Sequence, residues 1–168
     1  PDLLDYRAML FLNLFSLSDE KMAFLQRKIM CDGRTVAFVG PVGIVGPRGV
    51  DAARTSELLG WDVARSDLPP PLNATFAAGL TGVWEQTAGL RVGISRPFPS
   101  VAVPTDVGNA QVLAVFTGTP SPAILFEERD GVKLFWSVAP GLEAGVLRAL
   151  AETAGVPVVC RSNDAVYA

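Results

Sequence analysis

Residues 5–20, DYRAMLFLNLFSLSDE, predict the fold class more directly than any other part of the chain. Ala8 to Leu12 form an unbroken apolar run, which is typical of a strand covered on both faces. Asn13 to Leu17 turn the chain, and Ser18 then stands where a helix N-cap is expected. Asp19 and Glu20 follow in the first helical turn, where the positive end of the helix dipole favours acidic side chains. A strand that leads directly into a capped helix indicates an α/β fold.

A strand–helix–strand unit follows from this opening. Glu20 to Met30 carry an apolar stripe at helical spacing, Asp32-Gly33 ends that helix, and Thr35 to Val39 form a second β-rich run. The length suits a parallel crossover, so residues 8–12 and 35–39 are predicted to be adjacent parallel strands, both central and buried. On this prediction a charge at Leu10 would prevent folding, because a lone buried carboxylate has no partner.

The rest of the chain alternates short helices and strands less regularly. Ser66 to Pro71 form a proline-rich turn, Leu72 to Ser100 show no clear period, and Asp130-Gly131 predicts a hairpin turn. Helices are predicted at 51–59 and 140–154, and strands at 101–103, 111–117, 123–127, 132–138, 156–160 and 165–168.

Composition limits the kinds of partner. The 168 residues predict a single domain over 1–168, and since the sequence does not begin with Met, we expect it to be part of a longer chain. Hydrophobic residues make up 49% and charged residues 18%, with a mean hydropathy of +0.34, which predicts an exposed apolar surface for a partner. The net charge of −3 and the lack of a basic cluster argue against nucleic acid and anionic membranes.

The residues of common catalytic sites are missing. The chain has no histidine, which removes Ser-His-Asp and Cys-His-Asp triads and most zinc sites. Cys31 follows the first predicted helix and Cys160 lies in a late strand, so neither is placed as a nucleophile on a strand-to-helix turn. The sequence therefore predicts no catalytic residues, no metal and no cofactor.

One loop could still bind a small ligand. Gly40, Gly43, Gly46 and Gly49 recur at every third position between a predicted strand and a predicted helix, a context that suits anion binding. The spacing matches neither the dinucleotide fingerprint nor the P-loop, and prolines remove two amide donors. This loop and the turn after the first strand would together line the mouth of the site. The candidate ligand-binding residues there are Asn13, Ser16, Gly43 and Arg48.

The segment from Leu68 to Trp84 is the candidate partner surface. It has little charge and no clear helix or strand period, so Leu72 and Trp84 are the candidate interface residues. Trp84 is the tryptophan most expected to be exposed, whereas Trp136 lies in an apolar strand and is expected in the core.

Both ends of the chain resemble one known family. The opening has the pattern Tyr6-x-x-x-Leu10-Phe11-Leu12-Asn13-x-Phe15-x-Leu17-x-Asp19-Glu20, and the end has Leu147-Arg148-x-Leu150-Ala151-x-x-Ala154-Gly155-Val156 followed by Asp164-Ala165-Val166-Tyr167-Ala168. These motifs resemble the glutamine-amidotransferase-like domain of large glycoside hydrolases, called the trimerisation domain in β-galactosidases. Pro157 and Cys160 depart from the pattern, where a histidine and a small polar residue are expected.

The resemblance implies both a fold and a role. The fold it implies is a three-layer, flavodoxin-like α/β domain of the class I glutamine-amidotransferase type, with a mostly parallel sheet and one antiparallel hairpin. The role it implies is a non-catalytic structural and oligomerisation module, with neighbouring domains of the parent chain and further copies of itself as partners. Two alternatives stay open, a small-ligand or carbohydrate-binding module that uses residues 40–49 and an enzyme of unfamiliar type.

Overall fold

The computed structural model describes residues 5–67, 72–94 and 101–158. Its helical segments are α1 (Asp19–Phe24), the π-helix η2 (Leu25–Ile29), α2 (Ala52–Leu59), the 3₁₀-helix η3 (Gly82–Thr87) and α3 (Ala144–Thr153). Its strands are β1 (Ala8–Leu12), β2 (Thr35–Val39), β3 (Val45–Gly46), β4 (Gly49–Val50), β5 (Asp62–Ser66), β6 (Leu72–Phe76), β7 (Arg91–Ile94), β8 (Val101–Asp106), β9 (Gln111–Phe116), β10 (Pro122–Arg129) and β11 (Val132–Ser137).

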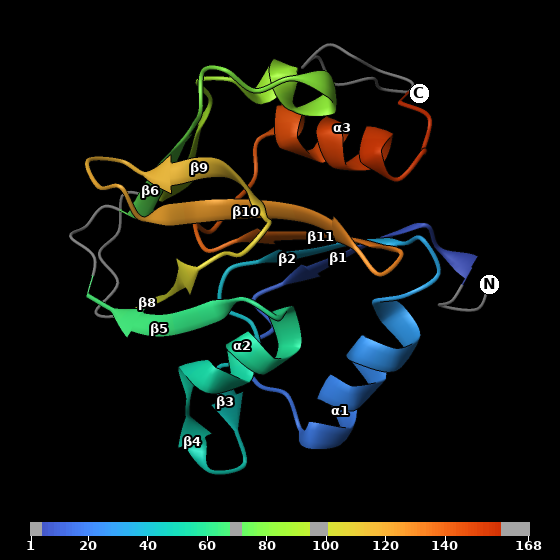
Figure 1. The fold of residues 1–168 in the computed structure, drawn as a ribbon, viewed down its shortest axis with the longest axis vertical. Coiled ribbons are helices and arrows are strands. Elements are labelled where there is room, and N and C mark those ends of the chain that lie inside the picture. The colour runs from blue at the N-terminus through green and yellow to red at the C-terminus, as the bar shows by residue number, and fades with distance from the viewer. Residues whose placement is uncertain (1–4, 68–71, 95–100, 159–168) are drawn as a thin grey trace.

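A seven-stranded mixed sheet organises these elements, in the order β1-β2-β11-β10-β9-β6-β7. Helix α3 lies on one side of the sheet, and α1, α2 and the β3–β4 hairpin lie on the other (Figure 1). The predicted α/β class is confirmed. The mostly parallel sheet is wrong, because only β1–β2 and β2–β11 are parallel and the other four neighbouring pairs are antiparallel. A flavodoxin-like three-layer fold is therefore not confirmed.

The first two strands pair as predicted, but their positions differ. β1 and β2 are parallel and in register from Ala8 opposite Thr35 to Leu12 opposite Val39. β2 is buried along its whole length between β1 and β11. The prediction that β1 is also central and buried is wrong, since it lies at the sheet edge with Leu10 45% and Leu12 63% exposed. A charge at Leu10 can consequently reach solvent and need not prevent folding.

Local signals placed most of the helices. Ser18 caps α1 by accepting a hydrogen bond of 3.3 Å at its hydroxyl oxygen from the amide of Lys21. Asp51 caps α2 in the same way, accepting a bond of 2.9 Å from the amide of Ala53. α2 ends at Gly60 in the left-handed conformation, which agrees with the predicted end at residue 59.

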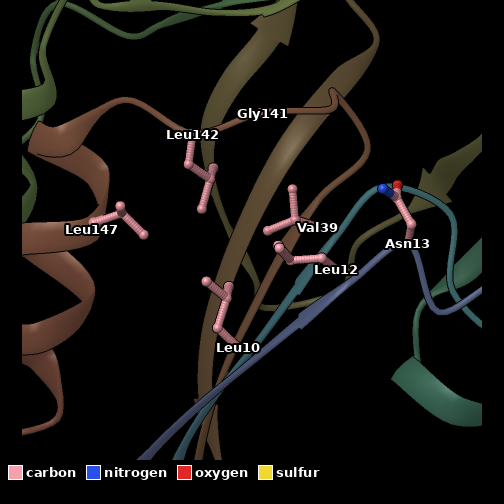
Figure 2. A pocket seen from close by; sticks show the side chains of 7 residues that line it. All are labelled: Leu10, Leu12, Asn13, Val39, Gly141, Leu142 and Leu147. Carbon is pink, nitrogen blue, oxygen red and sulfur yellow. The ribbon is translucent and has the colours of Figure 1, made fainter.

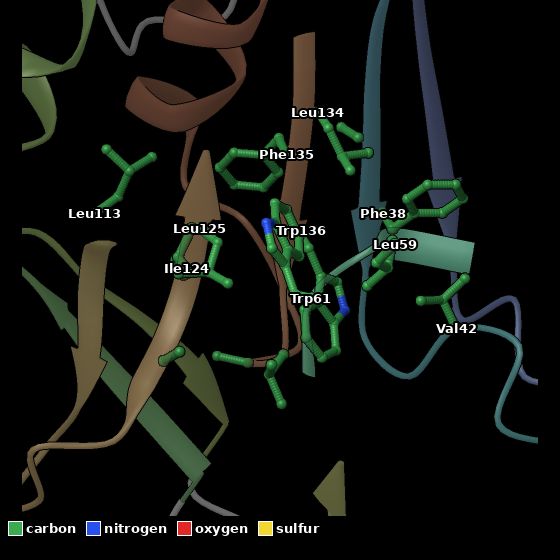
Figure 3. Close-up of a cluster of buried hydrophobic side chains, with 14 of the residues drawn as sticks. Phe38, Val42, Leu59, Trp61, Leu113, Ile124, Leu125, Leu134, Phe135 and Trp136 are labelled. Atoms are coloured by element: carbon green, nitrogen blue, oxygen red, sulfur yellow. The ribbon is translucent and has the colours of Figure 1, made fainter. Parts of the chain in front are cut away.

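The core is built from the buried side chains of β2, β11 and β10 and from the apolar side chains that pack against these strands (Figure 3). Trp136 is fully buried, as predicted, and stacks on Trp61 with ring centroids 6.3 Å apart. Trp84 was expected at the surface, and that prediction is wrong. Its side chain is 3% exposed and stacks on Phe135 at 5.7 Å, while Leu72 is 2% exposed. Both candidate interface residues are thus core residues that present no apolar surface to a partner.

The remaining elements confirm the antiparallel hairpin and differ from the predictions elsewhere. Asp130 and Gly131 adopt positive φ values of 47° and 72° between β10 and β11, as a tight hairpin turn requires. β5, which pairs with β8, was not predicted. Residues 156–158 were predicted to begin a strand, but the chain there is irregular and follows the end of α3. The predicted strand at 165–168 and Cys160 lie outside the described residues.

The position of β1 leads to a stability prediction. Phe38, in the middle of β2, is fully buried, so Phe38→Ala should lower the free energy of unfolding by about 3–5 kcal/mol through lost burial and the cavity left behind. Leu10→Ala should cost less than about 1 kcal/mol, because nearly half of that side chain is already in water. Urea denaturation at low protein concentration measures both. Equal losses in the two variants would contradict the edge position of β1.

Candidate functional site

The predicted ligand mouth forms where β1 and β2 end. The amide of Asn13 donates to the carbonyl of Val39 at 2.8 Å, and the amide of Gly43 donates to the carbonyl of Leu14, also at 2.8 Å. Ser16 forms a parallel bridge with Val45. Residues 13–17 therefore run beside residues 39–45, and the structure brings Asn13, Ser16 and Gly43 to one place as predicted.

Gly40 is the tightest point of this mouth. Its φ is +81°, and an added Cβ would lie 2.5 Å from the side-chain oxygen of Asn13, itself at a φ of 50°. The Gly40 amide donates to the carbonyl of Ser137 at 2.7 Å, and its carbonyl accepts from the indole nitrogen of Trp136 at 3.1 Å. Gly40 is thus held on both of its polar groups by β11, and only a glycine fits against Asn13.

Three of the amides that an anion cradle could use are bonded within the protein. Gly40, Gly43 and Val45 each donate to a backbone carbonyl, at 2.7, 2.8 and 2.9 Å. Pro41 and Pro47 have no amide hydrogen to offer. The glycine-rich loop is therefore better explained as a packed connection than as a phosphate-binding loop.

Arg48 stands apart from the other three candidates. It is exposed at the turn between β3 and β4, and no hydrogen bond or ion pair is recorded for it within the described part of the chain. The arginine that joins the two loops is Arg54 of α2, which sequence reasoning missed. Its guanidinium pairs with the carboxylate of Asp19 at 2.8 Å and donates to the carbonyl of Leu17 at 2.9 Å. Arg54 thereby ties α2 to the start of α1.

An apolar cavity of about 350 Å³ lies on the opposite face of β1 and β2, between these strands and α3. Its lining is Leu10, Leu12, Asn13, Val39, Gly141, Leu142 and Leu147, and Figure 2 shows the leucines of β1 and of the α3 side pointing toward a common space. A second cavity of about 170 Å³ shares Leu10 and Leu147 with the first and continues along β1 to Val156.

We call this depression the β1–α3 groove and define it by Leu10, Leu12, Leu142, Leu147 and Val156. Four of these five are among the large apolar side chains that remain exposed, Leu10, Leu12, Leu147 and Val156. The only polar side chain in the lining of its larger cavity is Asn13. A sugar site needs several convergent hydrogen-bonding groups, whereas an apolar groove suits a protein surface.

The described residues offer little for catalysis. Cys31 is half-buried, with its sulfur 3.3 Å from a carboxylate oxygen of Asp32 and 3.2 Å from the guanidinium of Arg34. No group of three His, Cys, Asp or Glu side chains that could hold a metal ion occurs in the described ranges. Nor is any helix there both long and apolar enough to cross a bilayer.

Comparison with known proteins gives matches among solved structures. No family model and no curated protein matches the sequence. A β-galactosidase from Bacillus circulans sp. alkalophilus superposes with a TM-score of 0.61 and 16% identity, over 93% of this chain and 24% of that one. A β-galactosidase from Rahnella sp. R3 gives a TM-score of 0.64 and 17% identity, over 94% and 24%.

A third solved structure is matched over a larger share of its own length. A cytoplasmic protein of Salmonella typhimurium LT2 gives a TM-score of 0.54 and 16% identity, over 91% of this chain and 69% of that one. At such low identity these likenesses show the fold alone. The chain spans about a quarter of the length of the β-galactosidase chains it matches.

The geometry predicts that the mouth does not bind sugars or phosphate. At about 10 mM galactose, lactose or phosphate, the melting temperature should therefore move by less than about 1 °C. A ligand that did bind, at 100 times its dissociation constant, would add about 2.7 kcal/mol to the free energy of unfolding and raise the melting temperature clearly. Differential scanning calorimetry measures the shift. A larger rise that Arg48→Ala removes would support a ligand-binding role for residues 40–49.

Proposed function

We propose that this chain is a non-catalytic structural module of a multidomain glycoside hydrolase, where it contacts neighbouring domains or other subunits. The proposal is supported by a fold likeness that covers more than nine tenths of this chain but about a quarter of each β-galactosidase chain. A unit of that relative size is one domain of a larger protein. The resemblance of the two chain ends to the trimerisation domain of β-galactosidases supports the same reading.

The observation that carries the assembly role is the β1–α3 groove. Most domains of this size keep exposed apolar side chains scattered, and such residues then need no explanation. Here Leu10, Leu12, Leu147 and Val156 line two adjoining cavities beside an edge strand. A gathered apolar depression of this kind is typical of a surface that another protein covers.

The composition supports the non-catalytic part of the proposal. With no histidine anywhere in the sequence, the usual base for activating a serine or cysteine near neutral pH is missing. The sulfur of Cys31 contacts Asp32 and Arg34 in the turn after η2, not a base at the start of a helix. The backbone of Ser16 forms a bridge with Val45, and its exposed hydroxyl has no recorded contact with a base among the described residues.

The first test is catalytic activity of the purified chain. We expect no turnover above the buffer rate with glutamine, p-nitrophenyl acetate or p-nitrophenyl β-galactoside, because the chain has no histidine and Cys31 does not lie on a strand-to-helix turn. Cys31→Ser and Ser16→Ala are the matched controls and should give the same background. Turnover that either substitution abolishes would contradict the non-catalytic role.

The second test is the coding sequence around this segment. If the chain is a module of a glycoside hydrolase, the same reading frame should encode a catalytic domain upstream, and a (β/α)₈ barrel of about 250 residues is the expected form. Sequencing the genomic region on both sides provides the answer. A reading frame with no hydrolase domain would overturn the proposed parent without bearing on the fold.

A further inference from the structure

The backbone of β1 has an open outer edge. In a parallel pair, alternate residues direct both their N–H and their C=O groups to the same neighbour. The carbonyl of Arg7 accepts from Thr35 at 2.8 Å, and the amide of Asn13 donates to Val39 at 2.8 Å, so the odd-numbered residues of this stretch face β2. The amides and carbonyls of Ala8, Leu10 and Leu12 therefore point away from β2. Among the described residues, no strand pairs with them.

Within the described residues, this edge carries none of the side chains that normally prevent strands from pairing with other molecules. Natural edge strands often carry lysine, proline, a bulge or an inward-pointing charge. β1 has the sequence AMLFL, with no charge and no proline, and its register with β2 is unbroken. Its most exposed side chains, Leu10 and Leu12, also line the β1–α3 groove. The edge thus offers hydrogen-bonding groups and apolar surface together.

We infer that a second copy of this chain covers the edge, with the two β1 strands antiparallel around a two-fold axis at Leu10. This inference rests on the proposed assembly function and specifies the partner and the surface. In this register, Leu10 lies opposite Leu10 of the other copy, and Ala8 lies opposite Leu12. All three residues with open backbone groups then form hydrogen-bonded pairs, giving about six hydrogen bonds between the strands.

The second copy fits because the edge is complementary to itself. An occupant must be an extended segment with free backbone groups and apolar side chains on the groove side, and β1 has these properties. No like charges meet, since Arg7 would lie opposite Asn13 and Asp5 opposite Phe15. The two-fold axis also places both grooves on the same face of the joined sheet, so that they adjoin.

The size of the surface sets the expected strength. A stable interface buries about 800 Å² per partner over about 20–30 residues, whereas β1 and the groove supply fewer than half that number. The isolated chain should therefore dimerise weakly, with a dissociation constant in the range of about 0.1–1 mM. Further domains of a parent protein would have to add the remaining contacts.

Analytical ultracentrifugation from about 10 μM to about 1 mM tests the surface. Leu12→Lys should weaken dimerisation at least about tenfold, because a buried lysine would face apolar side chains at the joined edge. Val50→Lys is the matched control, since Val50 is 60% exposed on β4 and should leave dimerisation unchanged. Circular dichroism checks that both variants stay folded.

Cysteine cross-linking tests the register, in a background with Cys31→Ser and Cys160→Ser. Leu10→Cys should form an intermolecular disulfide under mild oxidation, because hydrogen-bonded antiparallel residues have Cα atoms about 5.5 Å apart, within disulfide range. Leu12→Cys is the control. In the inferred register its two copies lie about 14 Å apart along the strands, too far to link.

The outcomes separate this inference from the proposed function. Selective cross-linking at residue 10 together with the Leu12→Lys effect supports the β1 dimer. Dimers that Leu12→Lys does not weaken would keep the assembly function and overturn β1 as its surface. Cross-linking that is equal at residues 10 and 12 would overturn the register. A chain that stays monomeric at every concentration would overturn the β1 dimer, whereas the contact with neighbouring domains in the proposed function is tested separately by the surrounding reading frame.

Discussion

The indole nitrogen of Trp136 donates a hydrogen bond to the carbonyl of Gly40, and the amide of Gly40 donates back to the carbonyl of Ser137. This pair of bonds joins the end of β2 to the end of β11 inside the core, where an unpaired polar group would be costly. Gly40 in turn leaves just enough room for the side chain of Asn13, which starts the turn after β1. The three parallel strands are thus held in position at the point where each one ends.

That arrangement gives the sheet a closed interior, with a strand edge at each end. β2, β11 and most of β10 have neighbours on both edges, and the stacked Trp61 and Trp136 fill the space between the sheet and α2. The carboxylate of Glu127 accepts from the indole of Trp61 and pairs with Arg129, so these polar groups at the border of the core are satisfied. β1 and β7 stand at the two ends of the sheet and each pairs along one edge only, and β1 is the one whose exposed leucines line the β1–α3 groove. The apolar surface that the composition predicts is therefore found at β1 and α3.

The loop at residues 40–49 has a spacing of glycines that suggests ligand binding, but its contacts in the structure are better explained by packing. Its glycines recur between a strand and a helix, which favours a ligand-binding interpretation. In the structure, its amides bond to Leu14, Phe15 and Ser137, and its Val42 carbonyl accepts from the hydroxyl of Thr55 on α2. The glycines permit close packing between neighbouring segments. The arginine that ties α2 to the start of α1 is Arg54, which no motif identified.

Local sequence was enough to place the secondary structure where a period, a cap or a turn was strong. Ser18, Asp51, Gly60 and Asp130-Gly131 each act through atoms a few residues away, so their effect is already present in the linear chain. The parallel pairing of β1 with β2 was also predictable, because a short helix joins them. The candidate site was predicted only in part: Asn13, Ser16 and Gly43 do come together, but the groove and Arg54 were missed.

Long-range pairing decided the rest. An apolar run such as AMLFL looks the same whether the strand lies at the centre of a sheet or at its edge, and only the arrangement of β11 beyond β2 puts β1 at the edge. Leu72 and Trp84 lie in a segment without clear periodicity, yet both are buried. The strand that contains Leu72, β6, pairs with β9, and Trp84 stacks on Phe135 of β11. Periodicity depends on neighbours in the chain, whereas burial depends on contacts between residues far apart, so only the tertiary structure could show which apolar residues remain exposed.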